Sequence, residues 1–287
     1  MARFTTSDGL ELYYTDTDAG TGAGTGTGAG RPILCLAGLT RNSADFTFLA
    51  PHLASHRLIC MDYRGRGQSA YDPDFSNYNI LREGQDALEL LDHLGLDQVT
   101  LIGTSRGGLI AMALAYGHPA RLKAVVLNDI GPDVDAKGLE RIMDYVGKEP
   151  GLPDLDSAAQ ALAHVHGPDF AGVSVERWRQ QAAFMFCEKP GGGLGLRYDA
   201  RLRDALTGQA GTGETADLWL LFDALKDIPL VVIRGENSDL LTAATLAKMQ
   251  EHHPGLIAAV VPDRGHVPFL DEAPALAAIH ALLEQTA

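Results

Sequence analysis

The chain has 287 residues, a formal net charge of −14 and a sequence pI near 5.0. Partners with phosphate-rich surfaces need clustered lysine and arginine, so this acidic balance argues against binding to nucleic acid or to a membrane surface. Apolar residues make up 46% of the chain. That share provides for a sizeable buried core, and the length fits one large α/β domain with an insertion.

The N-terminal segment predicts a β-hairpin. Residues 3–17 alternate apolar and polar side chains on both sides of Asp8-Gly9, a dipeptide typical of tight hairpin turns. In residues 19–30 every second residue is glycine. A dinucleotide-binding loop would follow a strand and open a helix, whereas this stretch leads into a strand, so we expect a flexible loop there.

From residue 32 onward, short apolar runs alternate with segments of helical spacing. The predicted strands cover residues 32–39, 56–63, 98–103, 122–131, 228–236 and 255–265. The predicted helices between them cover 43–54, 79–96, 107–119, 217–227, 243–253 and 273–285, with Gly95 as a C-terminal cap. This alternation predicts an α/β fold with a mostly parallel, doubly wound sheet.

The alternation stops between two of these strands. Residues 132–215 hold helical patches at 138–147, 156–166 and 175–186, separated by turns rich in glycine and proline, and no convincing strand. We therefore expect a helical insertion over 132–215, with core domain segments 1–131 and 216–287 on either side of it.

A serine lies between two glycines where the strand at 98–103 meets the next helix. The sequence Gly103-Thr104-Ser105-Arg106-Gly107 is the G-x-S-x-G pattern in the strand-turn-helix context that marks a nucleophile elbow. A sharp turn strains the serine backbone and needs small neighbours, and the helix start offers free N–H groups. Ser105 is therefore the predicted nucleophile, with an ordinary turn as the alternative.

A serine nucleophile needs a base and an orienting carboxylate. Of ten histidines, His266 is the predicted base because it lies in a loop after the last strand, whereas most others lie in or next to helical patterns. His164 and His166 end a helical patch in the insertion and could line a pocket. For the acid, both Asp239 and Asp129 follow a strand. Asp239 is favoured because it precedes the strand that leads to His266.

An oxyanion hole needs two N–H donors aimed at one point. The predicted donors are the backbone N–H groups of Arg106, directly after the nucleophile, and of Leu39, after the turn at Gly38. The Arg106 side chain could form an internal ion pair or face an anionic substrate.

The remaining features predict no cofactor and no metal. The three cysteines, Cys35, Cys60 and Cys187, have no C-x-x-C spacing, and no His, Cys and Asp cluster has the spacing of metal ligands. The odd cysteine count and the absence of a signal-peptide pattern lead us to expect a cytoplasmic protein without membrane spans. The oligomeric state is not predicted.

Taken together, these motifs resemble the α/β-hydrolase superfamily over nearly the whole chain. The matching stretches are LAGLTRN, DYRGRGQS, GTSRGG, RGENSDLL and DRGHVPFLDEAP. The resemblance implies Ser105, His266 and Asp239 as a catalytic triad and the insertion as a lid. Many members have His-Gly where this chain has Ala37-Gly38. Members that are dehalogenases or epoxide hydrolases use aspartate at the elbow, so serine at 105 argues against both activities.

The expected function is a serine hydrolase that cleaves a carboxylic ester or lactone of a small, largely apolar molecule. The alternatives are a hydrolase of carbon–carbon bonds in ring-fission diketones and, in a different class, a small-molecule receptor with the hydrolase fold. The candidate substrate-binding residues are Arg41, Trp178, Phe184 and Trp219, and the alternative for the aromatic ones, together with Phe186, is a small core of the insertion itself.

Overall fold

The computed structural model describes residues 2–17, 32–211 and 217–286. All of the predicted site residues lie in this range. The glycine-rich stretch at 19–30 lies outside the described residues, so the loop predicted there stays a prediction.

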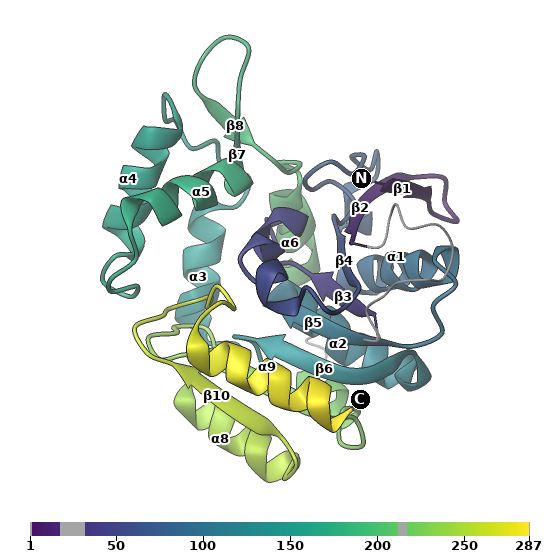
Figure 1. The fold of residues 1–287 in the computed structure, drawn as a ribbon. Coiled ribbons are helices and arrows are strands. Elements are labelled where there is room, and N and C mark those ends of the chain that lie inside the picture. Colours follow the sequence, from purple (N-terminus) through teal and green to yellow (C-terminus); the bar gives the residue numbers. More distant parts are fainter. Residues whose placement is uncertain (1, 18–31, 212–216, 287) are drawn as a thin grey trace.

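The described residues form an eight-stranded sheet with the order β1-β2-β4-β3-β5-β6-β9-β10 (Figure 1). The two N-terminal strands pair antiparallel through the Asp8-Gly9 turn, as predicted, and β2 joins β4 antiparallel. All strand pairs from β4 to β10 are parallel. The strands are β1 (Ala2–Thr5), β2 (Glu11–Asp16), β3 (Ile33–Leu36), β4 (Leu58–Met61), β5 (Val99–Thr104), β6 (Leu122–Asn128), β9 (Leu230–Gly235) and β10 (Ile257–Val261). The predicted α/β fold is confirmed.

Helices cover both faces of the sheet, which explains why its central strands are apolar on both sides. One face packs against α1 (Ile80–His93), α2 (Arg106–Gly117), α7 (Leu218–Asp223) and α8 (Ala243–His252). The other face packs against α9 (Ala273–Gln285) and two 3₁₀ helices, Ser43–Thr47 and Ala50–Leu53. The single helix predicted over 43–54 is thus two short ones. Pro51, which has no backbone N–H, lies at the start of the second.

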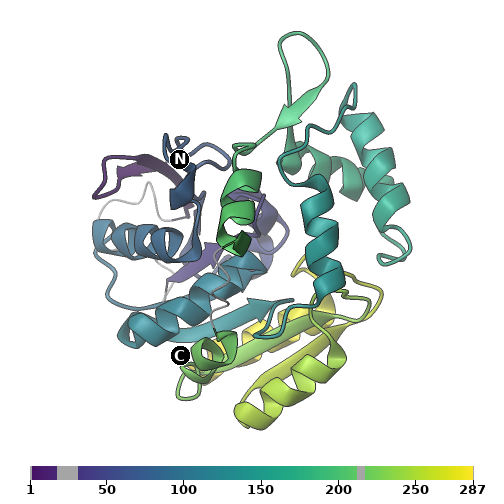
Figure 2. The same ribbon diagram turned by 180° about the vertical axis from the view of Figure 1, so that it is seen from behind.

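The segment between β6 and β9 contains α3 (Ala136–Tyr145), α4 (Leu155–His166), α5 (Val175–Met185), β7 (Phe186–Glu188), β8 (Leu194–Leu196) and α6 (Leu202–Gly211). In both views α3, α4 and α5 stand apart from the helices that flank the sheet (Figures 1 and 2). The prediction of an insertion without strands is wrong in one detail, because β7 and β8 form a small antiparallel hairpin. Strands of three residues are too short for an alternating pattern to stand out in the sequence.

Candidate active site

Ser105 occupies the sharp turn between β5 and α2. Its backbone has φ +50° and ψ −112°, a region that non-glycine residues rarely adopt. The glycines around it are required by close packing. A Cβ on Gly103 would lie 2.4 Å from the Gly107 carbonyl oxygen, and one on Gly107 would lie 2.1 Å from the Leu36 carbonyl oxygen. The glycines let helix α2 start directly against the sheet, with the serine at its tip.

The structure joins Ser105, His266 and Asp129 in one series of hydrogen bonds. Nε2 of His266 lies 3.0 Å from Oγ of Ser105, and Nδ1 of the same ring lies 2.7 Å from Oδ2 of Asp129. The Asp129 side chain is fully buried, and that of His266 is 14% exposed. This geometry suits proton transfer from a serine hydroxyl to an imidazole whose orientation a carboxylate fixes.

Asp129 is held from three sides. Its Oδ1 accepts a hydrogen bond from the Gly235 N–H at 2.8 Å, and its Oδ2 accepts one from the Ser238 hydroxyl at 2.6 Å, besides its contact with His266. The backbone at Asp129 has φ +56°, again in the strained left-handed region. Hydrogen bonds from the loop after β9 therefore fix the carboxylate that faces the histidine.

Asp239 was the favoured prediction for this place and Asp129 the alternative, and the structure brings Asp129 there. The Asp239 carboxylate instead forms an ion pair with Arg141 of α3 at 2.6 Å, and 31% of its side chain is exposed. Strands β6 and β9 are neighbours in the sheet, so the loops after both strands reach the same region. From the loop after β9, Ser238 donates its hydroxyl to Asp129, while the carboxylate of the next residue, Asp239, faces Arg141.

The two predicted oxyanion donors flank this site. Among the described residues, no turn, loop or cap hydrogen bond of the backbone has the Leu39 or the Arg106 N–H group as its donor. Arg106 is the first residue of α2, so its N–H has no partner within the helix. The Gly38 carbonyl accepts from the Arg41 N–H at 3.1 Å. In a trans peptide this turns the Leu39 N–H to the opposite side.

The Arg106 side chain points into the protein. Its Nε lies 2.5 Å from Oε2 of Glu83, a fully buried carboxylate on α1, and its Nη2 donates to the Tyr78 carbonyl at 3.2 Å. Of the two roles considered for this arginine, the structure thus favours the internal ion pair over contact with a substrate.

Ser105 and His266 line a cavity of about 550 Å³ between the core and the inserted segment. Arg41 and Trp178 also line it, as expected for substrate-binding candidates. Arg41 is paired with Asp45 at 2.6 Å and hydrogen-bonded to Gln181. Trp178 is buried and stacks on His166 with ring centroids 5.5 Å apart.

Two of the substrate-binding candidates lie elsewhere. Phe184 lines a separate cavity of about 500 Å³ and contacts the Phe48 ring. Trp219 lies on α7, where its indole N–H donates to Asp133 at 2.8 Å and its ring contacts His252. The sequence offered both as substrate-binding residues or as part of a small core of the insertion, and helical spacing does not indicate which neighbour a helix face meets.

Several cavity residues were not singled out from the sequence. Arg141 and Tyr145 of α3 are two of these. His166 was predicted as a possible pocket residue together with His164, and His166 lines the cavity whereas His164 is not among its lining residues. Their positions depend on how the inserted helices pack on the core, and the sequence patterns of those helices do not predict that packing.

The part of the chain that the structure describes holds no group of three or more His, Cys, Asp or Glu side chains that could bind a metal ion. No helix within it is both long and apolar enough to cross a membrane.

A comparison with protein-family models matches residues 31–273 to the alpha/beta hydrolase fold. The chain belongs to this family. The match spans the elbow at Ser105, the inserted segment and His266, so the alpha/beta hydrolase assignment covers the whole site.

Individual alpha/beta hydrolases resemble this chain along most of its length. A 3-hydroxybutyrate-oligomer hydrolase of Cupriavidus necator is 34% identical over 252 residues, 85% of each chain. A 2-(acetamidomethylene)succinate hydrolase of Mesorhizobium japonicum is 29% identical over 83% of this chain and 82% of its own. The crystal structure of an alpha/beta hydrolase from Novosphingobium aromaticivorans superposes with a TM-score of 0.90 at 39% identity, covering 99% of this chain and 97% of its own.

Proposed function

We propose that this hydrolase is a serine esterase that cleaves a carboxylic ester or lactone of a small, largely apolar molecule. The observation that carries the proposal is the series of hydrogen bonds from Ser105 through His266 to Asp129, of which Ser105 and His266 line the cavity. We assign Ser105 as nucleophile, His266 as general base and acid, and Asp129 as the orienting carboxylate.

In the first half of the reaction, Nε2 of His266 removes the proton from the Ser105 hydroxyl as Oγ attacks the ester carbonyl carbon. The carbonyl oxygen becomes an oxyanion that the N–H groups of Leu39 and Arg106 stabilise, each contributing on the order of 3 kcal/mol. His266 then gives its proton to the leaving alcohol as the tetrahedral intermediate collapses to an acyl-enzyme.

In the second half, water takes the place of the alcohol. His266 removes a proton from the water molecule, whose oxygen attacks the acyl carbon, and the same N–H groups stabilise the second oxyanion. Return of the proton to Oγ of Ser105 releases the carboxylic acid. Asp129 holds Nδ1–H of His266 and stabilises the positive charge that the ring carries in both halves.

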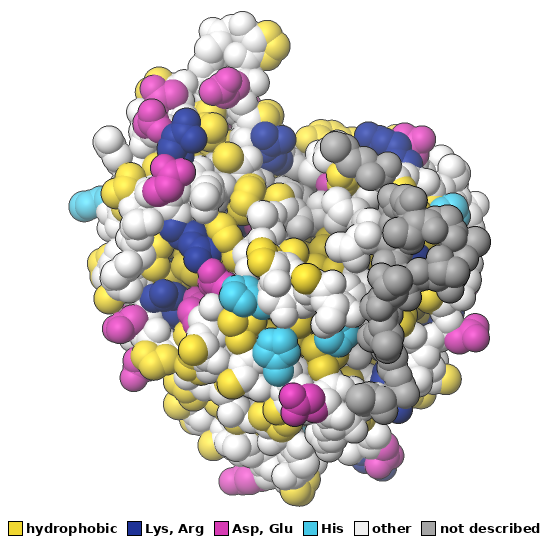
Figure 3. Space-filling model, in the orientation of Figure 1, with side chains coloured by type: hydrophobic (Ala, Val, Ile, Leu, Met, Phe, Trp, Pro, Cys, Tyr) yellow, Lys and Arg dark blue, Asp and Glu magenta, His cyan; other side chains and the backbone are white. Residues whose placement is uncertain are grey.

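The cavity supports an ester with limited charge. Its arginines at 41 and 141 are already paired with Asp45 and Asp239, and apolar side chains such as Leu162, Trp178 and Phe269 form much of its wall. Basic and acidic side chains lie intermingled over the inserted segment on the face in Figure 3. The 3-hydroxybutyrate-oligomer hydrolase relative supports the ester reaction, since units of hydroxybutyrate are joined as esters.

We further propose that residues 132–215 act as a lid over this cavity. Ion pairs join it to the core beside apolar clusters. Arg177 of α5 pairs with Asp271 and lies 3.7 Å above the Phe48 ring, and Arg141 of α3 pairs with Asp239. Both ion pairs are partly exposed, so water can replace them when the segment moves, which suits a segment that must admit substrate.

A panel of p-nitrophenyl esters with acyl chains from acetyl to dodecanoyl tests the proposal. We expect turnover by the wild type, loss of it in Ser105→Ala, and retention of it in Ser55→Ala, which removes an exposed hydroxyl. The chain-length optimum would report the size of the acyl site. Absence of turnover on every ester would contradict the esterase proposal. The protein would then be tested for cleavage of ring-fission diketones and for stable retention of a small-molecule ligand.

A further inference from the structure

Both proposed oxyanion donors are connected to one buried carboxylate on helix α1. On one side, Nε of Arg66 donates to the Leu39 carbonyl oxygen at 3.1 Å, and Nη1 of Arg66 lies 2.8 Å from Oε1 of Glu83. On the other side, Oε2 of Glu83 lies 2.5 Å from Nε of Arg106. The two oxygens of Glu83 thus reach the two backbone segments that would form the oxyanion hole.

These three side chains are almost completely buried. The exposed fraction is 1% for Arg66, 0% for Glu83 and 5% for Arg106, so two cations share a single anion away from water. Burial lowers the pKa of Arg66, and the nearby positive charge of Arg106 lowers it further. Well-packed apolar side chains often stabilise a fold as much as a buried ion pair does. Stability alone therefore does not account for this cluster.

The contacts restrict the backbone at both donors. The Gly38 carbonyl is fixed by the Arg41 N–H and the Leu39 carbonyl by Arg66, so the peptide groups on both sides of Leu39 are held. At α2 the side chain of Arg106 is held by Glu83. Movement of either arginine would change the separation of two N–H groups that must converge on one oxygen atom.

We propose that Glu83 is a positioning residue for the oxyanion hole, which sets the Leu39 and Arg106 N–H groups relative to each other through Arg66 and Arg106. The inference rests on the esterase proposal above. It predicts that disturbing Glu83 lowers the rate of the chemical step and leaves substrate binding nearly unchanged, because Glu83 does not line the cavity.

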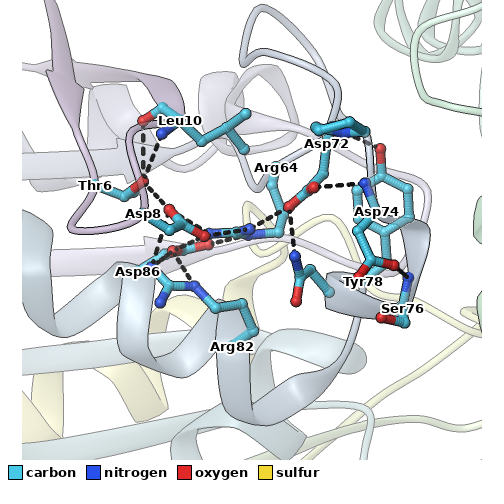
Figure 4. A network of polar contacts seen from close by, with 12 residues as sticks. Thr6, Asp8, Leu10, Arg64, Asp72, Asp74, Ser76, Tyr78, Arg82 and Asp86 are labelled. Carbon is cyan, nitrogen blue, oxygen red and sulfur yellow. Dashed lines mark hydrogen bonds and ion pairs between the residues drawn. The ribbon is translucent and has the colours of Figure 1, made fainter.

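The same helix offers a matched control. Asp86 lies three residues after Glu83, is also fully buried, and contacts Arg64 through both oxygens at 2.7 Å. Figure 4 shows that the Arg64 cluster ties Asp8 of the N-terminal hairpin turn to Asp72 and Asp86. The Asp86 carboxylate accepts hydrogen bonds from Arg64 and Arg82, which do not lead to Leu39 or Arg106 among the described residues.

The experiment compares Glu83→Gln and Asp86→Asn with the wild type. Three quantities are measured for each: the urea midpoint of unfolding, kcat and KM on the best p-nitrophenyl ester, and the rate at which an alkyl fluorophosphonate labels Ser105. We expect both variants to unfold at lower urea. Glu83→Gln should lose between about tenfold and a hundredfold in kcat and in labelling rate with KM within about twofold, whereas folded Asp86→Asn should keep kcat and labelling rate within about twofold.

Arg66→Met provides a second variant in case Glu83→Gln does not fold. It removes the contact with the Leu39 carbonyl and leaves Glu83 and Arg106 as a balanced pair, and the same loss in kcat is expected. Unchanged kcat in folded Glu83→Gln or Arg66→Met, or an equal loss in Asp86→Asn, would overturn the positioning role. A wild type that reacts neither with esters nor with the fluorophosphonate would instead contradict the esterase proposal itself.

Discussion

Ser105 and Asp129 follow two residues that pair with each other in neighbouring strands, Thr104 of β5 and Asn128 of β6. The Ser105 N–H donates to the Asn128 carbonyl at 2.9 Å. Ser105 and Asp129 both have positive φ, +50° and +56°. The proposed nucleophile and its proposed acid therefore leave the sheet side by side. His266 closes the series between them from the loop after β10.

The Ser238 hydroxyl supports the Asp129 carboxylate. It donates to Oδ2 at 2.6 Å and accepts from the N–H groups of Leu240 and Leu241 at 3.2 and 3.1 Å, so its own proton is directed at Asp129. We expect Ser238→Ala to lower kcat by about threefold to tenfold and stability by about 1.5–3 kcal/mol, the range for a hydrogen bond to a charged group. Ser238→Thr, which keeps the hydroxyl, should restore most of both, and steady-state kinetics with urea unfolding would measure it. Equal losses in both variants would contradict a role for the hydroxyl.

Gly107 allows α2 to start against β3. An added methyl group would meet the Leu36 carbonyl at 2.1 Å, which only a backbone shift can relieve. We expect Gly107→Ala to lower the free energy of unfolding by about 3 kcal/mol and to abolish most activity. Gly117 ends the same helix with nothing near the position of a Cβ. Gly117→Ala should therefore be neutral or stabilising by up to about 1 kcal/mol. Comparable losses in the two variants, measured by urea unfolding, would speak against this packing explanation.

His166 should make the stability of the protein depend on pH. Burial beside Trp178 lowers the pKa of His166 below its ordinary value of 6.5, and the Arg141 charge adds to the shift. Above pH 6.5 the ring is neutral in the folded and unfolded chains. As pH falls below 6.5, the unfolded chain takes up a proton that folded His166 resists, so the free energy of unfolding decreases.

Urea unfolding at pH 7.5 and pH 5.5 would test this dependence. The decrease in stability between the two pH values should be smaller in His166→Gln than in the wild type. His118→Gln, at an exposed position, should keep the wild-type difference. An unchanged pH dependence in His166→Gln would show that the burial of this ring does not act on stability as described.

The sequence predicted most of what local patterns determine. Alternating strands and helices gave the α/β fold, and the glycines around Ser105 gave the elbow, because close backbone approach restricts which residues fit there. A histidine in the loop after the last strand indicated the base, and the structure places this residue, His266, beside Ser105.

Long-range docking could not be predicted in the same way. Asp129 and Asp239 both follow strands, and which of them pairs with His266 depends on which side chain turns toward the histidine ring. The positive φ at Asp129 and the hydrogen bonds from Gly235 and Ser238 decide that direction. Trp219 and Phe184 were misplaced for a related reason, since helical spacing does not say which neighbour a face will meet.

The assignment of Asp129 as the orienting carboxylate is tested by the kcat of Asp129→Asn and Asp239→Asn, measured side by side on the ester that the wild type cleaves fastest. Loss of an orienting carboxylate in a serine triad lowers kcat by about 10⁴-fold in the best-studied example. We expect a loss of at least about a thousandfold in Asp129→Asn. Asp239→Asn should retain at least about a hundredfold more activity than Asp129→Asn, because its side chain pairs with Arg141 and not with His266. The reverse order of activities would contradict the assignment of Asp129 and restore Asp239 as the acid.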